Sequence, residues 1–298
     1  MTSLRIRIFI ALVVIIWSLT ATVEAVTLRG LTPMQFTAWA ALCSAAGTLA
    51  FLLATGRTRA LLRYRGRDHV RLVVLSVLGF AGYFTLKYYA YTTVQIPQAN
   101  ILQYTYPLFI VLFAMPILGQ PITAKKIIGI GSGFLGAVII FSGGRLIAMD
   151  WNEFGGYLAA FAAGLSWGLF SVLAARFAFE TLTSLFFLQM YSAGIMFLLI
   201  IRGGFFDIPS GWSEICGVVY SGVISNLFGN LLWLTAQKFT SDVSLITGAL
   251  YLIPFLSLLA LHLLLGFPIP GAAAVGLALI VGGMMYTNFR SGAVTVKK

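Results

Sequence analysis

Apolar runs of about 20 residues recur along the whole chain, and short connections between them hold most of the charged residues. A helix of roughly 20 apolar residues is long enough to cross the hydrocarbon core of a bilayer. The pattern therefore predicts ten membrane-spanning helices, called spans one to ten. Their ranges are 6–28, 33–54, 70–93, 97–118, 123–142, 153–178, 182–202, 213–237, 243–265 and 271–288.

The stretch 104–136 is repeated, without a gap, 147 residues later at 251–283. Both copies hold an apolar helix with a proline, a Leu-Gly-x-Pro-Ile turn and a second helix with several glycines. Matched prolines and glycines are informative because they mark bends, turns or close helix contacts. The matching positions are Tyr104, Pro107, Leu118, Gly119, Pro121, Ile122, Gly129 and Gly136, which fall on Tyr251, Pro254, Leu265, Gly266, Pro268, Ile269, Gly276 and Gly283.

The composition supports a membrane protein. Hydrophobic residues make up 60% of the chain and charged residues 9%, and the mean hydropathy is +0.97, which leaves too little charge to cover a soluble domain. If the amino terminus is cytoplasmic, the only Lys or Arg residues outside the cell are Arg29, Arg145 and Arg202. Lys87 lies within a span, and every other Lys and Arg faces the cytoplasm. The positive-inside rule thus predicts two cytoplasmic termini, and it explains the net charge of +11 without nucleic acid.

Ten spans divide into two sets of five, residues 1–145 and 146–298 of a single membrane domain. Because five is odd, the second set enters the membrane from the opposite side. We therefore expect an all-α polytopic membrane protein of two inverted five-helix repeats. Such repeats are typical of secondary transporters, which bind substrate near the midplane where the halves meet; the alternative is a duplicated scaffold without transport.

Each of the two five-span halves ends with a proline-bearing helix, a Leu-Gly-x-Pro-Ile turn and a glycine-rich helix. In this arrangement nearly the whole chain resembles the EamA family of the drug/metabolite transporter superfamily. The chain is rich in aromatic residues, and in this respect it resembles the bacterial aromatic amino-acid exporters of this family. Gln120 and Phe267 stand where many members have Glu, so a role for that acid does not carry over. The resemblance implies a carrier in the bacterial inner membrane that releases small metabolites by alternating access.

Polar side chains within a span must face a cavity or another helix, because the bilayer core offers them no water. In span eight, Asn226, Asn230 and Trp233 follow a spacing that puts them on one helix face. We interpret this stripe as a cavity wall, with interhelical hydrogen bonding as the alternative. Trp17 and Trp167 lie in the middle of the first span of each half, and we expect them to hold an aromatic ring unless they serve only packing.

Tyr83 is the repeat equivalent of Asn230 and shares a helix face with Lys87. Lys87 is the only Lys or Arg deep within a span, and Glu24 is the only carboxylate clearly within one. At about 1.5 Å per residue, Glu24 lies roughly 5 Å and Lys87 roughly 9 Å from the outer ends of their spans, close enough to meet. Two interpretations are open: a structural charge pair, or a Lys87 that attracts a substrate carboxylate while Glu24 tunes it or exchanges a proton.

Spans four and nine are candidate hinges. Tyr104 and Pro107 share one face of span four, and Tyr251 and Pro254 hold the equivalent positions in span nine. Proline removes a backbone hydrogen bond and gives the helix a bend that can change between states. We therefore assign the tyrosines to the substrate site and the prolines to the hinges, with a rigid packing kink as the alternative.

The chain lacks His-Glu-x-x-His and a Walker sequence, and Cys43 and Cys216 follow no zinc spacing. We expect no enzyme, metal or cofactor, and a monomer whose partners are the bilayer and a small-molecule substrate. The predicted function is export of small amphipathic metabolites, with aromatic amino acids as the leading class, driven mainly by the substrate gradient. The alternatives are a thiol amino acid, nucleobase or cationic drug on the same fold, or a passive channel or scramblase.

Overall fold

The computed structural model describes residues 3–119, 121, 123–141, 152–239 and 243–288, and all regular structure in these ranges is helical. Helices occupy each of the ten predicted ranges as far as these residues reach. Their bounds are α1 (Ser3–Thr27), α2 (Pro33–Ala54), η1 (Thr58–Arg63), α3 (Gly66–Ser76), η2 (Val77–Gly82), α4 (Tyr83–Thr93), α5 (Ile96–Gln103), α6 (Tyr106–Leu118), α7 (Ala124–Phe141), α8 (Phe154–Phe177), α9 (Thr181–Gly203), α10 (Trp212–Val219), η3 (Tyr220–Gly229), α11 (Asn230–Phe239), α12 (Val243–Leu265) and α13 (Gly271–Asn288).

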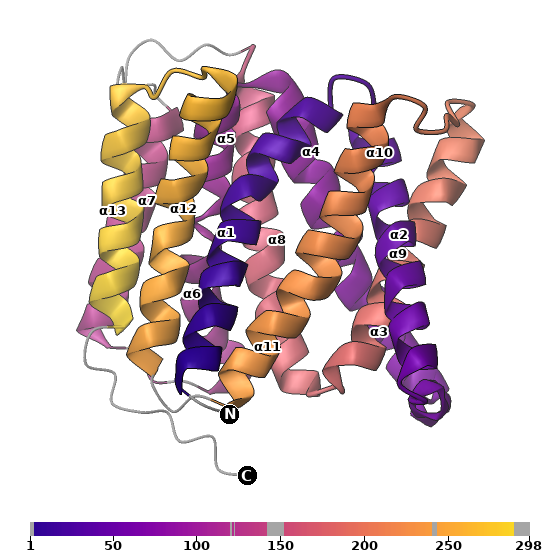
Figure 1. Cartoon of the computed structure of the whole chain (residues 1–298). Coiled ribbons are helices and arrows are strands. Elements are labelled where there is room, and N and C mark those ends of the chain that lie inside the picture. Colours follow the sequence, from indigo (N-terminus) through magenta and orange to yellow (C-terminus); the bar gives the residue numbers. More distant parts are fainter. Residues whose placement is uncertain (1–2, 120, 122, 142–151, 240–242, 289–298) are drawn as a thin grey trace.

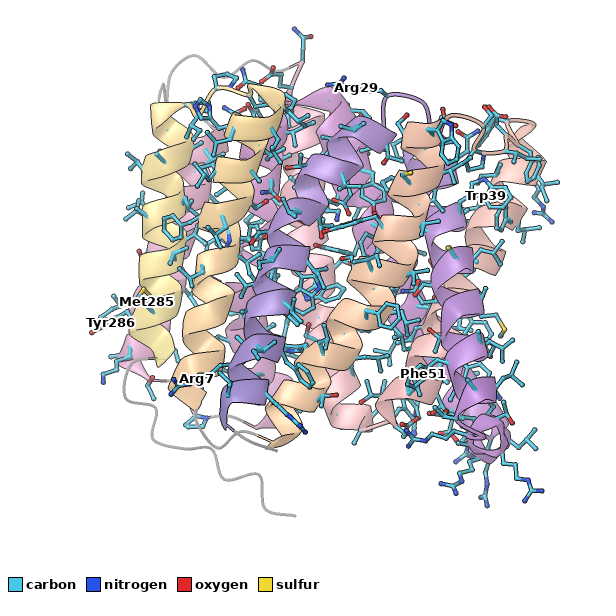
Figure 2. The ribbon with its side chains drawn as sticks, in the orientation of Figure 1. Arg7, Arg29, Trp39, Phe51, Met285 and Tyr286 are labelled. Atoms are coloured by element: carbon cyan, nitrogen blue, oxygen red, sulfur yellow. The ribbon has the colours of Figure 1, made fainter. Side chains whose placement is uncertain are left out.

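The helices stand side by side as a bundle (Figure 1). Within the described residues, seven helical segments are long and apolar enough to cross a membrane, and shorter apolar helices cover Leu252–Leu265 and Gly271–Gly283. Arg7 near the start of α1 and Tyr286 near the end of α13 lie at one end of the bundle, while Arg29 lies at the other (Figure 2). The amino-terminal end of α1 and the carboxy-terminal end of α13 therefore lie on the same side of the bundle.

Helices α7 and α13, which are equivalent in the repeat, pack against each other through their glycines. A Cβ added at Gly136 would lie 2.6 Å from the carbonyl oxygen of Gly276, and one added at Gly276 would lie 2.8 Å from that of Gly136. Gly283 meets the carbonyl of Gly129 in the same way. Positions 129 and 276 are repeat equivalents, and so are 136 and 283. The contact between Gly136 and Gly276 therefore has an equivalent contact between Gly283 and Gly129, as at a two-fold interface. These glycines thus pack the two halves against each other within one chain.

Helices α6 and α12 end in the same way, each at the glycine of its Leu-Gly-x-Pro-Ile sequence. Gly119 and Gly266 adopt left-handed backbone conformations, with φ angles of 66° and 71°. A residue with a Cβ would be strained there, which explains why both copies carry glycine at the helix end.

Spans three and eight are interrupted by π-helical turns. The segments η2 and η3 end at Gly82 and Gly229, which are repeat equivalents, 147 residues apart. A π turn bonds residue i to i+5 and is often found at functional sites. Each of these spans is therefore an α–π–α helix, a feature that the apolar pattern did not predict.

Spans four and nine differ, although their prolines are equivalent. Span four is broken between α5 and α6 at Tyr104 and Thr105, and Pro107 lies in the first turn of α6, where a missing N–H costs little. Helix α12 instead runs without a break through Pro254. The side chain of Pro107 lies outside the described part of the chain. Equivalent sequences thus adopt a broken and a continuous form in the two halves.

Helix α8 approaches the break in span four closely. A Cβ at Gly164 would lie 2.6 Å from Thr105 Oγ1, and one at Gly168 would lie 2.5 Å from the Cβ of Phe109. The two glycines flank Trp167, so this contact fixes where the indole stands.

Candidate functional site

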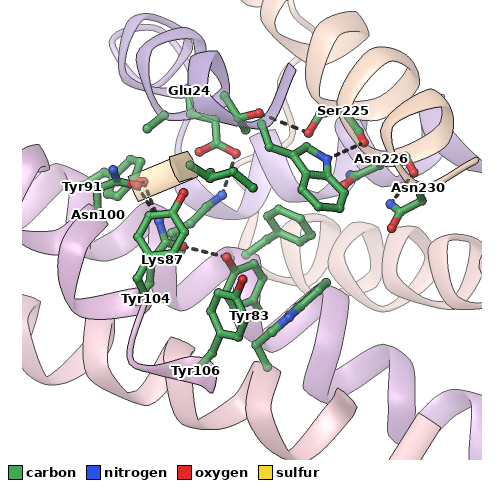
Figure 3. A pocket seen from close by; sticks show the side chains of 17 residues that line it. Glu24, Tyr83, Lys87, Tyr91, Asn100, Tyr104, Tyr106, Ser225, Asn226 and Asn230 are labelled. Carbon is green, nitrogen blue, oxygen red and sulfur yellow. Dashed lines mark hydrogen bonds and ion pairs between the residues drawn. The ribbon is translucent and has the colours of Figure 1, made fainter. Parts of the chain in front are cut away.

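A cavity of about 140 Å³ lies between the two halves of the chain. Figure 3 shows Tyr91, Tyr104 and Lys87 on one side of it, and Ser225, Asn226 and Asn230 on another. Residues of α1, α4, α5, α6, α8, η3, α11 and α12 border it, and the break in span four contributes as well. They are Trp17, Thr20, Ala21, Glu24, Tyr83, Phe84, Lys87, Tyr91, Asn100, Gln103, Tyr104, Tyr106, Trp167, Ser225, Asn226, Asn230 and Ile253.

Aromatic rings form much of the cavity wall. The rings of Tyr83 and Trp167 lie 4.7 Å apart, centroid to centroid, with their planes inclined by 46°. Tyr106 adds a third ring, 6.4 Å from Trp167. Aromatic faces of this kind favour a flat, apolar ligand.

Trp17 is held in place by the π-helical segment η3. Its indole Nε1 donates to the carbonyl oxygen of Ser225 over 3.3 Å, and its ring lies 5.7 Å from that of Trp233. A Cβ at Gly229 would lie only 2.6 Å from this Nε1, so the glycine makes room for the indole. Trp233 itself does not border the cavity and instead packs on Trp17.

A buried ion pair closes another side of the cavity. Lys87 Nζ lies 2.6 Å from Glu24 Oε1, which also accepts a hydrogen bond from the hydroxyl of Tyr88 over 2.9 Å. Glu24 is 1% exposed and Lys87 4%. An unpaired charge at this depth would cost several kcal/mol, so the pair stabilises both groups. Glu24 Oε2 is buried and has no hydrogen-bond partner among the described residues.

The ammonium of Lys87 is also surrounded by aromatic rings. Its Nζ lies 4.7 Å from the ring centroid of Phe84, 4.8 Å from that of Tyr88 and 5.4 Å from that of Tyr83. Cation–π contacts of this length are attractive, and more so in a desolvated site.

A chain of hydrogen bonds connects three helices beside the cavity. Tyr83 donates to Gln103 Oε1 over 2.7 Å, and Gln103 Nε2 donates to Asn100 Oδ1 over 2.7 Å and to the hydroxyl of Tyr91 over 3.0 Å. Asn100 Nδ2 in turn donates to Ser257 Oγ of α12 over 2.8 Å. The chain thus joins the ring of Tyr83 to both candidate hinge helices.

Most of the predicted site residues meet at this cavity. Trp17, Glu24, Tyr83, Lys87, Tyr104, Trp167, Asn226 and Asn230 border it, and Trp233 lies behind Trp17. Asn230 Nδ2 donates to the carbonyl oxygen of Asn226 over 2.6 Å, so the span-eight stripe combines a cavity wall with bonding inside its own helix. The backbone of Tyr251 lies in α12, but its side chain lies outside the described residues.

Sequence reasoning missed several lining residues, among them Gln103, Tyr91 and Tyr106. Gln103 carried a usable signal, since it is an amide within an apolar span. Tyr91 carried none, because tyrosines near span ends are commonly interfacial anchors. Tyr106 lies in the middle of span four, two residues from Tyr104, and carried the signal of a tyrosine within a span.

Metal chemistry has no support in the described residues, which hold no group of three or more His, Cys, Asp or Glu suited to a metal ion.

The sequence model of the EamA-like transporter family matches residues 4–142 and 154–289. The chain is 31% identical over 217 residues to the aromatic amino acid exporter YddG of Ancylobacter novellus, covering 70% of this chain and 73% of that protein. It is 28% identical over 233 residues to a probable terminal-alkyne amino-acid exporter of Streptantibioticus cattleyicolor, covering 77% and 76% of the two chains. It is also 22% identical to an uncharacterized transporter of Bacillus subtilis, YoaV, over 93% of this chain and 94% of that one.

A solved crystal structure has the same fold. It superposes with a TM-score of 0.66 at 25% sequence identity, and the match covers 96% of this chain and 97% of the other. The helical arrangement is thus shared over almost the whole length of both chains.

Proposed function

Because this chain belongs to the EamA-like transporter family and is therefore a polytopic membrane transporter rather than an enzyme, we propose that it exports aromatic amino acids from the cell. It is a secondary transporter that works by alternating access and is driven mainly by the substrate gradient. The observation that carries this proposal is the cavity between the halves, which combines aromatic walls with one buried ion pair.

The substrate class is supported by the chemistry of this cavity. Tyr83, Tyr106 and Trp167 form a wall for a flat ring, and Lys87 supplies a positive charge for a carboxylate. Two relatives with amino-acid export in their names point to the same class.

The proposed architecture is ten transmembrane helices in two inverted repeats, 1–145 and 146–298, with both termini in the cytoplasm of a bacterial cell and the chain in its inner membrane. Two findings support it. The family model matches the chain twice, over 4–142 and 154–289. The glycine contacts between α7 and α13 also occur in equivalent pairs, as a two-fold relation between the halves requires.

Alternating access is supported by the difference between spans four and nine. The break at Tyr104 and Thr105 and the continuous α12 are two forms of one repeated sequence. In our proposal each span changes to the other form when the cavity opens to the opposite side, and Pro107 and Pro254 are the hinges.

Uptake into liposomes that hold the purified protein tests the function. We expect saturable uptake of radiolabelled phenylalanine and tryptophan, little uptake of threonine, and faster uptake when unlabelled phenylalanine is inside. Such counterflow identifies a carrier, because a pore does not show it. Uptake should persist when a pH gradient is collapsed at constant substrate gradient. Equal, unsaturable leakage of all three amino acids would overturn the proposal.

A further inference from the structure

The described residues around the cavity carry one charge of each sign. Among these lining residues, Glu24 is the only carboxylate and Lys87 the only ammonium; the others are aromatic, apolar, hydroxyl or amide side chains. An α-amino acid likewise carries one ammonium and one carboxylate on a single carbon atom. We propose that the Glu24–Lys87 pair is the receptor for this zwitterion: the pair opens, Lys87 binds the substrate carboxylate and Glu24 binds the substrate ammonium. This inference rests on the proposed export of amino acids.

The hydrogen bonding of the two Glu24 carboxylate oxygens supports this role. Its Oε1 is occupied by Lys87 and Tyr88, whereas its buried Oε2 has no hydrogen-bond partner in the described part of the chain. The carboxylate projects into the cavity toward Lys87 (Figure 3). A buried acceptor without a donor is costly, and a substrate ammonium supplies the missing donor.

The surroundings of Lys87 allow it to change partners. Its ammonium lies within 5.4 Å of the ring centroids of Phe84, Tyr88 and Tyr83. These rings hold the ammonium in place by cation–π attraction while the carboxylate beside it changes from Glu24 to the substrate. The hydroxyl of Tyr88 remains bonded to Glu24 and keeps that carboxylate oriented.

The size of the cavity requires such an opening. Its volume of about 140 Å³ is below the roughly 300–1,000 Å³ of common ligand pockets. Glu24 lies on α1 and Lys87 on α4, so breaking their contact makes room between the two helices. The ring of the substrate then lies toward the wall formed by Tyr83 and Trp167.

The receptor should distinguish amino acids from analogues that carry only one of the two charges. A zwitterion replaces both partners of the broken pair. Phenylethylamine lacks the carboxylate and would leave Lys87 unpaired, and 3-phenylpropionate lacks the ammonium and would leave Glu24 unpaired. We expect each analogue to bind on the order of 100-fold more weakly than phenylalanine, because each leaves one buried charge without a partner.

Competition against uptake of labelled phenylalanine tests the receptor in wild-type protein and in isosteric variants. In the wild type, both analogues should compete about 100-fold less well than phenylalanine. Glu24→Gln should favour 3-phenylpropionate relative to phenylalanine, and Lys87→Met should favour phenylethylamine. A merely structural pair would not produce these opposite shifts. Thr48→Val is the matched control, because Thr48 is buried in α2 away from the cavity and bonds only within its helix.

The variant Glu24→Gln/Lys87→Met removes both buried charges and serves if the single variants fail to fold. It should lose the discrimination, so that all three compounds compete to a similar degree. Wild-type competition by either analogue as strong as by phenylalanine, or unchanged preferences in the variants, would overturn the receptor while leaving aromatic export intact.

The proposed function and the receptor can fail separately. If the wild type shows no saturable uptake of phenylalanine, aromatic export is wrong. Thermal stabilisation of the purified protein by each of the 20 amino acids, compared with its amine and acid analogues, then decides on the receptor. Stabilisation by an amino acid but by neither analogue supports it, and no such preference overturns it.

Discussion

The rings of Tyr83 and Trp167 lie 4.7 Å apart although they belong to different halves of the chain, Tyr83 to α4 and Trp167 to α8. The two side chains form one wall of the cavity, and the same contact joins the halves. Any movement of one half against the other therefore changes this wall. In the proposed mechanism, substrate binding and the rearrangement of the halves are coupled at this point.

Replacing Trp167 with Ala should weaken transport of aromatic amino acids. The change removes the largest ring from the wall beside Tyr83, and stacking together with the lost apolar contact corresponds to about a 10-fold rise in KM. Uptake of labelled phenylalanine in liposomes measures it. Trp212→Ala is the control, since Trp212 is 83% exposed and lies away from the cavity, and its KM should not change. Equal effects of both substitutions would argue against the wall.

Replacing Gly229 with Ala should impair transport through Trp17. The new Cβ would lie 2.6 Å from the indole Nε1, which must move and give up its bond to the Ser225 carbonyl. We expect several-fold lower uptake with normal expression and elution on size-exclusion chromatography. Gly194→Ala in α9 is the control, because a Cβ there meets nothing within 4 Å and alanine favours a helix by up to about 1 kcal/mol. Normal uptake by Gly229→Ala would remove Trp17 from the mechanism.

Replacing Gly136 with Val should destabilise the contact between α7 and α13. A Cβ at Gly136 already meets the carbonyl of Gly276 at 2.6 Å, so a larger side chain must push the helices apart. Overpacking of this kind costs about 1–3 kcal/mol, which should lower the Tm in detergent by several degrees. Gly131→Val in the same helix faces open space and should leave the Tm unchanged. The same Tm for both variants would contradict the packing described.

The hinge assignment predicts that Pro254→Ala slows turnover. Alanine restores the backbone N–H that α12 lacks and stiffens the helix, so kcat should fall several-fold while KM stays nearly constant. Pro116→Ala is a matched control, because Pro116 also lies inside a helix, α6, but its repeat equivalent is Leu263 rather than a proline. A rise in KM with constant kcat would assign Pro254 to the binding site instead.

Cysteine labelling tests the proposed orientation. In a Cys43→Ala/Cys216→Ser background, a cysteine at exposed Arg29 should react with a membrane-impermeant maleimide in intact cells. A cysteine at exposed Arg59 should react only after the membrane is permeabilised. The reverse pattern would invert the topology and place both termini outside.

The positions of the helices could be predicted from the sequence because the bilayer imposes a length on each apolar run. Side chains that share a helix face could be predicted as well. Trp17 and Glu24, seven residues apart on α1, border the same cavity, as do Tyr83 and Lys87 on α4.

The π-helical turns and the break in span four could not be predicted, since they depend on tertiary contacts. Thr105 at the break rests against Gly164, and Gly229 at the end of η3 rests against Trp17, and both contacts join residues far apart in the chain. The extra residue of a π turn also rotates the next helical turns away from the positions that a regular α-helix would give them. Asn226 and Asn230 border the cavity, whereas Trp233 lies behind Trp17.

The matched ends of η2 and η3, at Gly82 and Gly229, bear on the history of the chain. A π turn holds one residue more than the α turn it replaces. If the two halves arose by duplication, one insertion before it would account for both ends, whereas a later insertion would require the same event twice. The ancestor would then be a half-length protein that already carried this turn. Two copies of it in opposite orientations would meet through the same glycine contacts, as a homodimer that was later fused into one chain.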